Sequence, residues 1–77
     1  MSLESANPPG GRQALKRRDE IARQGIEEGD HVDFGGRICR VAAITPNQHL
    51  HLVEDIDGRE VDVGQVSPFL VTKIEGD

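Results

Sequence analysis

The sequence predicts a mostly β domain in which one N-terminal α-helix precedes a small antiparallel sheet of five strands. Three observations favour this fold class. Residues 30–63 alternate apolar with polar side chains over short segments, as half-buried strands do. Hairpin signals separate those segments: Gly35-Gly36 and Asp57-Gly58 supply positive φ, and the loop from Thr45 to Gln48 contains a Pro-Asn pair that presets a type I turn. Ahead of them, residues 12–24 carry apolar side chains at helical spacing.

Size and composition set limits on the core and on the class of protein. The chain has 77 residues, of which 35% are hydrophobic, with two Phe and no Trp or Tyr. A domain this small buries only roughly 60% of the surface that its unfolded chain exposes, so we expect a thin aliphatic core. The single cysteine excludes an internal disulfide, no apolar run approaches the ~20 residues of a membrane span, and the first residues lack the pattern of a signal peptide. We therefore expect a soluble cytoplasmic protein that does not enter a membrane.

Charge is distributed unevenly along the chain. Residues 1–26 hold five basic and three acidic side chains, whereas residues 27–77 hold four basic and eleven acidic ones. The acidic body should repel nucleic acid phosphate, and the basic N-terminal part is the exception.

The N-terminal part divides into a tail and a helix. Residues 1–11 include Asn7-Pro8-Pro9-Gly10-Gly11, a run that interrupts both helices and sheets, so we expect a disordered tail. Residues 12–25 read as a helix whose narrow apolar stripe includes Leu15 and Ile21, with Gly25 as its αL cap. A helix this short is marginal alone and needs a surface to dock against.

Loop lengths predict the strand register. A two-residue loop at Gly35-Gly36 places Val32 opposite Cys39, and a four-residue loop from Thr45 to Gln48 places Val41 opposite Leu52. The latter loop also sets Ala43 opposite Leu50. Residues that face each other across a ladder point to the same side, so these side chains are expected to point inward together.

The hairpin at Asp57-Gly58 leaves two alternatives. A two-residue loop pairs Leu52 with Val63, and a four-residue loop pairs Leu52 with Val61. We favour the four-residue loop because it sets Glu54 across from Arg59, whereas the shorter loop opposes two acids, Asp55 and Glu60. Both loops predict the same core: Val32, Phe34, Cys39, Val41, Ala43, Leu50, Leu52, Val61 and Val63.

The opposite face of the predicted sheet is not uniformly polar. Arg40, Ile44, His49, His51 and Val53 share it, and we consider this apolar and imidazole patch the candidate protein-binding surface. Two alternatives remain open. In one, the helix covers the patch through Leu15 and Ile21; in the other, a bulge turns Ile44 inward.

Residues 29–75 resemble an SH3-like small β-barrel. The resemblance is carried by the Gly29-Asp30-x-Val32 start, the strand that begins Arg37-Ile38, and Val66 to Phe69, a predicted 3₁₀ turn that leads into a last strand paired with the first. This superfamily includes KOW and Tudor modules, and a leading helix before five strands also resembles Sm-like RNA-binding proteins. The Sm signature does not match, and the absence of Tyr and Trp leaves no aromatic cage or groove, so no family's binding residues carry over.

Chemical motifs are weak. His49-x-His51 has metal-ligand spacing on a strand, but no third ligand shares its face, and Cys39 is expected to be a small core hydrophobe. The carboxylates around the last hairpin are typical of a solvated face. We therefore predict no metal site, no cofactor and no catalytic residue, and expect a protein that is not an enzyme.

Three functions are compatible with these patterns. We favour a non-enzymatic protein-interaction module, an adaptor or assembly component that binds a protein partner or a second copy through the outer sheet face or the acidic hairpin. The alternative is an RNA- or DNA-binding module of Sm-like or KOW-like type. Its candidate residues are Arg12, Lys16, Arg17, Arg18, Arg37 and Arg40. A third, less favoured function is an inhibitor whose acidic hairpin mimics nucleic acid.

Overall fold

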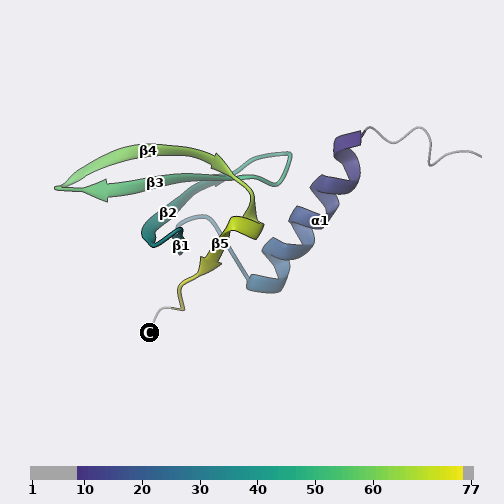
Figure 1. Cartoon of the computed structure of the whole chain (residues 1–77), viewed down its shortest axis with the longest axis horizontal. Helices are drawn as coiled ribbons and strands as arrows, with labels where there is room; N and C mark the ends of the chain where they lie inside the picture. Colours follow the sequence, from purple (N-terminus) through teal and green to yellow (C-terminus); the bar gives the residue numbers. More distant parts are fainter. Residues whose placement is uncertain (1–8, 76–77) are drawn as a thin grey trace, which may run out of the picture.

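The structure is a computed structural model that describes residues 9–75. One helix, α1, is followed by a meander of strands and a short 3₁₀ turn (Figure 1). Their bounds are α1 Pro9–Gln24, β1 His31–Phe34, β2 Arg37–Ile44, β3 Leu50–Ile56, β4 Arg59–Val66, η2 Pro68–Leu70 and β5 Val71–Lys73. The molecule is elongated, with extents of 55 × 24 × 19 Å, because α1 and the β3–β4 hairpin project from opposite ends of the sheet.

All five strands form one antiparallel sheet in the order β4-β3-β2-β1-β5. The predicted mostly β fold with one leading helix is therefore confirmed, and so is the return of the last strand to the first, through pairs such as Asp33 with Thr72. Within residues 9–75, β4 and β5 form the two edges and do not pair with each other. The sheet is open.

Helix α1 begins at Pro9, three residues before the predicted start, and so includes residues 9–11 of the expected tail; residues 1–8 lie outside the described part. Proline suits the first turn of a helix because its missing N–H has no intrahelical partner there. At the other end the predicted cap at Gly25 is confirmed by its φ of +71°. The N–H groups of Gly25 and Ile26 donate to the carbonyls of Ala22 and Ile21, at 3.1 and 3.0 Å, which is a Schellman motif.

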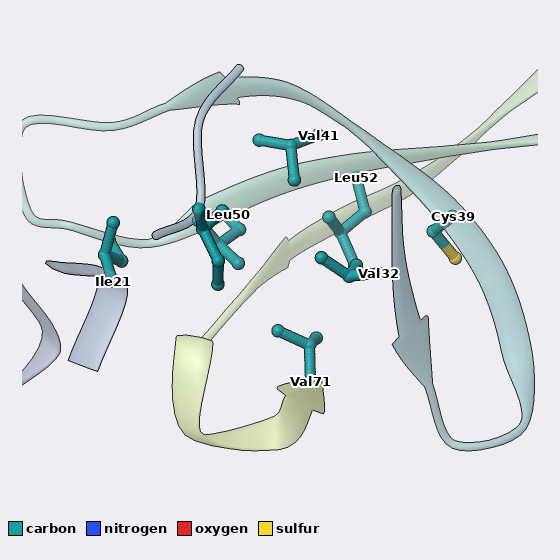
Figure 2. Close-up of a cluster of buried hydrophobic side chains, with 8 residues drawn as sticks. Ile21, Val32, Cys39, Val41, Leu50, Leu52 and Val71 are labelled. Atoms are coloured by element: carbon teal, nitrogen blue, oxygen red, sulfur yellow. The ribbon is translucent and has the colours of Figure 1, made fainter. Parts of the chain in front are cut away.

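The hydrophobic core lies on the inner face of the sheet, closed at one end by the last turn of α1 (Figure 2). Five of the nine predicted core residues are fully enclosed: Val32, Cys39, Val41, Leu50 and Leu52. The prediction missed Ile21, Ile26 and Val71, which complete the cluster. Two predicted members were wrong, because Val61 is exposed and Ala43 pairs with His51 on the outer face. Phe34 and Val63 are only partly buried against the core.

The β1–β2 and β2–β3 pairings agree with the predicted register as far as a bulge in β2. Val32 pairs with Cys39 across a loop whose glycines both have positive φ, and Val41 pairs with Leu52 as expected. A bulge at Ala42 then shifts the register by one residue, so that Leu50 pairs with Ile44 in place of the predicted Ala43. Ile44 therefore packs partly against the core, as the bulge alternative expects.

The loop of the β3–β4 hairpin has two residues, whereas the prediction favours four. Ile56 pairs with Arg59, and Asp55 pairs with Glu60 in spite of their like charges. Asp57 and Gly58 have φ of +54° and +81°, the left-handed pair that a type I′ turn requires. A second bulge follows, because Val53 pairs with Asp62 but Leu52 pairs with Gly64, whose φ is +108°.

Side-chain hydrogen bonds hold α1 against η2 and β5. Gln24 is the centre of this contact: its Nε2 donates to the carbonyl of Val71 at 3.1 Å, and its Oε1 accepts from the N–H of Lys73 at 2.7 Å. Lys73 Nζ donates in turn to the carbonyl of Gly25 at 2.8 Å. The helix thus docks at the end of the sheet, and the alternative in which it covers the outer face through Leu15 and Ile21 is not realised, since Leu15 is exposed and Ile21 belongs to the inner core.

Candidate functional site

The predicted protein-binding surface is only partly assembled. Arg40, His51 and Val53 share the outer face of the sheet, since Arg40 pairs with Val53 and His51 is the next outward residue on β3. The bulge removes Ile44 to the inner face, and His49 lies in the loop before β3. The structure therefore does not bring the five predicted residues together.

Ion pairs cover most of what remains of that face. The Arg40 guanidinium reaches across β3 to the carboxylate of Glu60 on β4, and Val53, between them in the sheet, is only 9% exposed. His51 Nε2 lies 2.7 Å from Oδ1 of Asp62, an oxygen that also accepts from the N–H of Gly64 at 3.0 Å. Among the large aliphatic residues of this face, Ile38 is the exposed one, at 54%. One exposed side chain does not make an apolar docking patch.

The six basic residues considered for nucleic-acid binding lie in two separate regions. Arg12, Lys16 and Arg18 are exposed on α1, where Arg17 Nε donates to the carbonyl of Asn47 at 2.9 Å. Arg37 lies 3.5 Å from the carboxylate of Glu54, and Arg40 pairs with Glu60. Because the two sheet arginines are neutralised by acids and lie away from the helix, the geometry gives a continuous phosphate-binding track little support.

Cys39 and the histidines occupy unreactive or separate positions. The Cys39 thiol is 1% exposed, and burial, with a smaller contribution from the charge of Glu54, raises its pKa. His49 is in a loop while His51 contacts Asp62. Across residues 9–75, no three His, Cys, Asp or Glu side chains are grouped closely enough to hold a metal ion.

Two open depressions flank β5. The first, about 410 Å³, is bordered by Glu20, Arg23, Gln24 and Lys73. Hydrogen bonds from Arg23, and to a smaller extent from Gln24, lower the pKa of Glu20 to about 2. These polar side chains of the depression are therefore already hydrogen-bonded to one another.

The second depression, about 510 Å³, is bordered by Asp30 and Lys73 among others. The N–H of Glu27 donates to Oδ2 of Asp30 at 2.8 Å, and Lys73 Nζ lies 3.3 Å from the same oxygen. These contacts lower the pKa of Asp30, and the backbone hydrogen bond makes the largest contribution. Both depressions therefore lie at contacts that hold α1, β1 and β5 together.

The feature that the sequence did not reveal is the free side of the β3–β4 hairpin. This hairpin extends past the core and away from α1 (Figure 1), and residues 55–62 are all exposed. Ile56 and Val61 are 44% and 42% exposed on the same face as Leu52, where they pair with Arg59 and Glu54. Two exposed apolar side chains therefore lie among charged ones on the inner face of the hairpin. The alternating pattern predicts that Val61 faces inward. It does not show how far along the sheet the inner face is covered by other parts of the chain.

Strand β4 is also an edge of the sheet over its whole length of eight residues. Its backbone pairs with β3 on one side, and no described strand pairs with the other. An edge strand presents a row of N–H and C=O groups that can pair with a further strand. The hairpin therefore combines a hydrogen-bonding edge with exposed apolar side chains.

No protein-family model, curated protein or solved structure matches this chain. Within residues 9–75, no helix combines the length and the apolar character that a membrane crossing requires.

Proposed function

We propose that this protein is a non-enzymatic protein-interaction module that binds an extended segment of a partner along the free edge of β4. The observation that carries the proposal is the eight-residue edge strand beside the exposed pair Ile56 and Val61. Strand addition of this kind uses main-chain hydrogen bonds for affinity and alternate side chains for specificity. It fits the prediction that a partner binds at the acidic hairpin, and it replaces the outer face as the proposed contact.

The expected energies are sufficient for reversible binding. Each added backbone hydrogen bond contributes roughly 0.5–1.5 kcal/mol net. Covering Val61, which is a little under half exposed, adds about 1 kcal/mol, because full burial of such a side chain is worth about 1.5–3 kcal/mol; Ile56 lies on β3, with Arg59 between it and an added strand. An added strand on β4 can therefore hold a peptide without a preformed pocket.

The topology also supports the SH3-like expectation, which we retain as part of the proposal. A four-strand meander, a 3₁₀ turn at Pro68–Leu70 and a final strand paired with the first follow the order that the resemblance implies. In a closed barrel the edges would be hidden. In the open sheet of residues 9–75, β4 stays available for a partner.

Selection from a displayed library of random octapeptides, followed by amide hydrogen exchange on the complex, tests this function. We expect the selected peptides to slow exchange at backbone amides of β4 and to leave the β1–β2 hairpin unchanged. Val61→Asp should weaken binding at least about tenfold, since it sets a charge in the apolar contact. Ile38→Asp is the matched control, because Ile38 is also exposed, at 54% against 42% for Val61, but lies on the outer face, opposite Asp33. Binding that is lost in Ile38→Asp and kept in Val61→Asp, or no selected peptide at all, would refute strand addition at β4.

A further inference from the structure

We infer that the segment bound along β4 alternates basic with apolar residues. This inference rests on the proposed strand addition and defines the chemistry of the partner. It follows from the different character of the two faces of the hairpin: the inner face carries the exposed Ile56 and Val61 beside Arg59 and Glu54, and the outer face carries Asp55, Glu60 and Asp62. Because successive side chains of a strand point to opposite faces, an added strand meets both surfaces with a period of two.

The outer face of the hairpin is negative at the β4 edge. Glu60 and Asp62 lie two residues apart on β4, and Asp55 lies across from Glu60 on β3. Glu60 contacts Arg40 and Asp62 contacts His51, but the two carboxylate side chains remain 59% and 71% exposed. Both carboxylates therefore contact partners on β2 and β3 and remain accessible to a cationic side chain of a further strand.

The spacing of these acids matches alternate residues of a strand. Two residues of an extended chain span about 6.7 Å, so lysines or arginines at alternate positions of an added strand come opposite both Glu60 and Asp62. The residues between them point to the inner face and cover Val61. Acidic residues at the same positions would stand directly opposite like charges, which is unfavourable.

The same charges disfavour a second copy of this chain as the occupant. In an antiparallel pair of two β4 strands centred on residue 61, Glu60 of each copy stands opposite Asp62 of the other. Centring the pair on residue 62 sets the two Asp62 carboxylates against each other. In these two registers, which bring Val61 near the centre of the contact, the edge is therefore better suited to a different, basic chain than to a second copy.

Three capped octapeptides test the inference: alternating lysine and valine, alternating serine and valine, and alternating glutamate and valine. Binding is measured by calorimetry, with amide hydrogen exchange to locate each peptide. We expect the lysine peptide to protect β4, to bind about tenfold more tightly than the serine peptide, and to lose this advantage as salt rises, while the glutamate peptide does not bind.

The double variant Glu60→Gln with Asp62→Asn should reduce the affinity of the lysine peptide to that of the serine peptide. Asp19→Asn, which removes an exposed acid on α1, is the control and should change nothing. Circular dichroism spectra that match those of the unchanged protein confirm that each variant folds.

The outcomes separate the two proposals. Equal binding of the lysine and serine peptides on β4 overturns the inference about charge and leaves strand addition in place. Absence of β4 protection by every peptide overturns both. Protection of β4 that rises with protein concentration, without peptide, overturns the inference in favour of self-pairing.

Discussion

Gln24→Ala tests how the helix is attached to the sheet. The substitution removes the donor to the carbonyl of Val71, at 3.1 Å, and the acceptor for the N–H of Lys73, at 2.7 Å. Each of these hydrogen bonds contributes roughly 0.5–1.5 kcal/mol net, so the pair is worth about 2 kcal/mol. Alanine recovers a few tenths of a kcal/mol through its higher helix propensity. We therefore expect the free energy of unfolding to fall by about 1.5–2 kcal/mol.

That loss is large for a domain of 77 residues, whose total stability is expected to be about 4–11 kcal/mol. It corresponds to a decrease in the melting temperature of about 10 °C. The chain has no Trp or Tyr, so far-ultraviolet circular dichroism in urea and on heating is the suitable assay. Amide exchange at Lys73 should also become faster, because its N–H loses its acceptor.

Gln13→Ala is the matched control, since Gln13 is exposed on the same helix and should change stability by no more than a few tenths of a kcal/mol. If Gln24→Ala and Gln13→Ala gave the same unfolding curves, the Gln24 contacts would add nothing to stability. The account of helix docking given above would then be refuted.

Two further predictions concern the core and the response to acid. Leu52→Ala should lower the free energy of unfolding by about 2–5 kcal/mol, because Leu52 is fully enclosed. Ile38→Ala should change it by less than about 0.5 kcal/mol, because Ile38 is exposed. Similar urea midpoints for the two variants would contradict the assignment of the faces. Folding lowers the pKa of Glu20 from 4.5 to about 2 through its hydrogen bonds with Arg23 and Gln24, so the charged form stabilises the fold above about pH 4.5 and this contribution disappears as pH falls toward 2. Glu20→Gln should therefore weaken the dependence of unfolding on pH in that window, and an unchanged dependence would show that the carboxylate plays no part.

The sequence predicts the inner face of the sheet well where turn chemistry determines the register. Two adjacent glycines in left-handed conformation fix the first hairpin, and the pairing of Val32 with Cys39 follows from them. The core prediction fails where burial depends on tertiary contacts. Ile26 and Val71 are enclosed because the helix cap and the last strand close over one end of the sheet, which periodicity alone does not show.

The errors in the predicted register come from two bulges and one turn, and only the first bulge changes the candidate surface. Nothing in the alanines around residue 42 signals a bulge, and yet that bulge moves Ile44 to the other face. Gly64 in the middle of a strand is a recognisable cue for the second one. At Asp57-Gly58 the repulsion between Asp55 and Glu60 is weaker than the preference of the turn for Asp-Gly. A like-charge pair on an exposed strand costs little, and here Arg40 partly compensates for it, whereas the type I′ turn has a strong preference for Asp-Gly.

The projection of the β3–β4 hairpin also makes its length adjustable. Residues 55–60 contribute no buried side chain, so the fold does not depend on how far the two strands run before they turn. Adding or deleting two residues from each strand next to the Asp57-Gly58 turn keeps the pairing of all the remaining residues, the face on which each lies and the hydrogen-bonded pair that closes the turn. The reach of the molecule can therefore be lengthened or shortened stepwise, and a foreign peptide can be grafted at the tip, without disturbing the core.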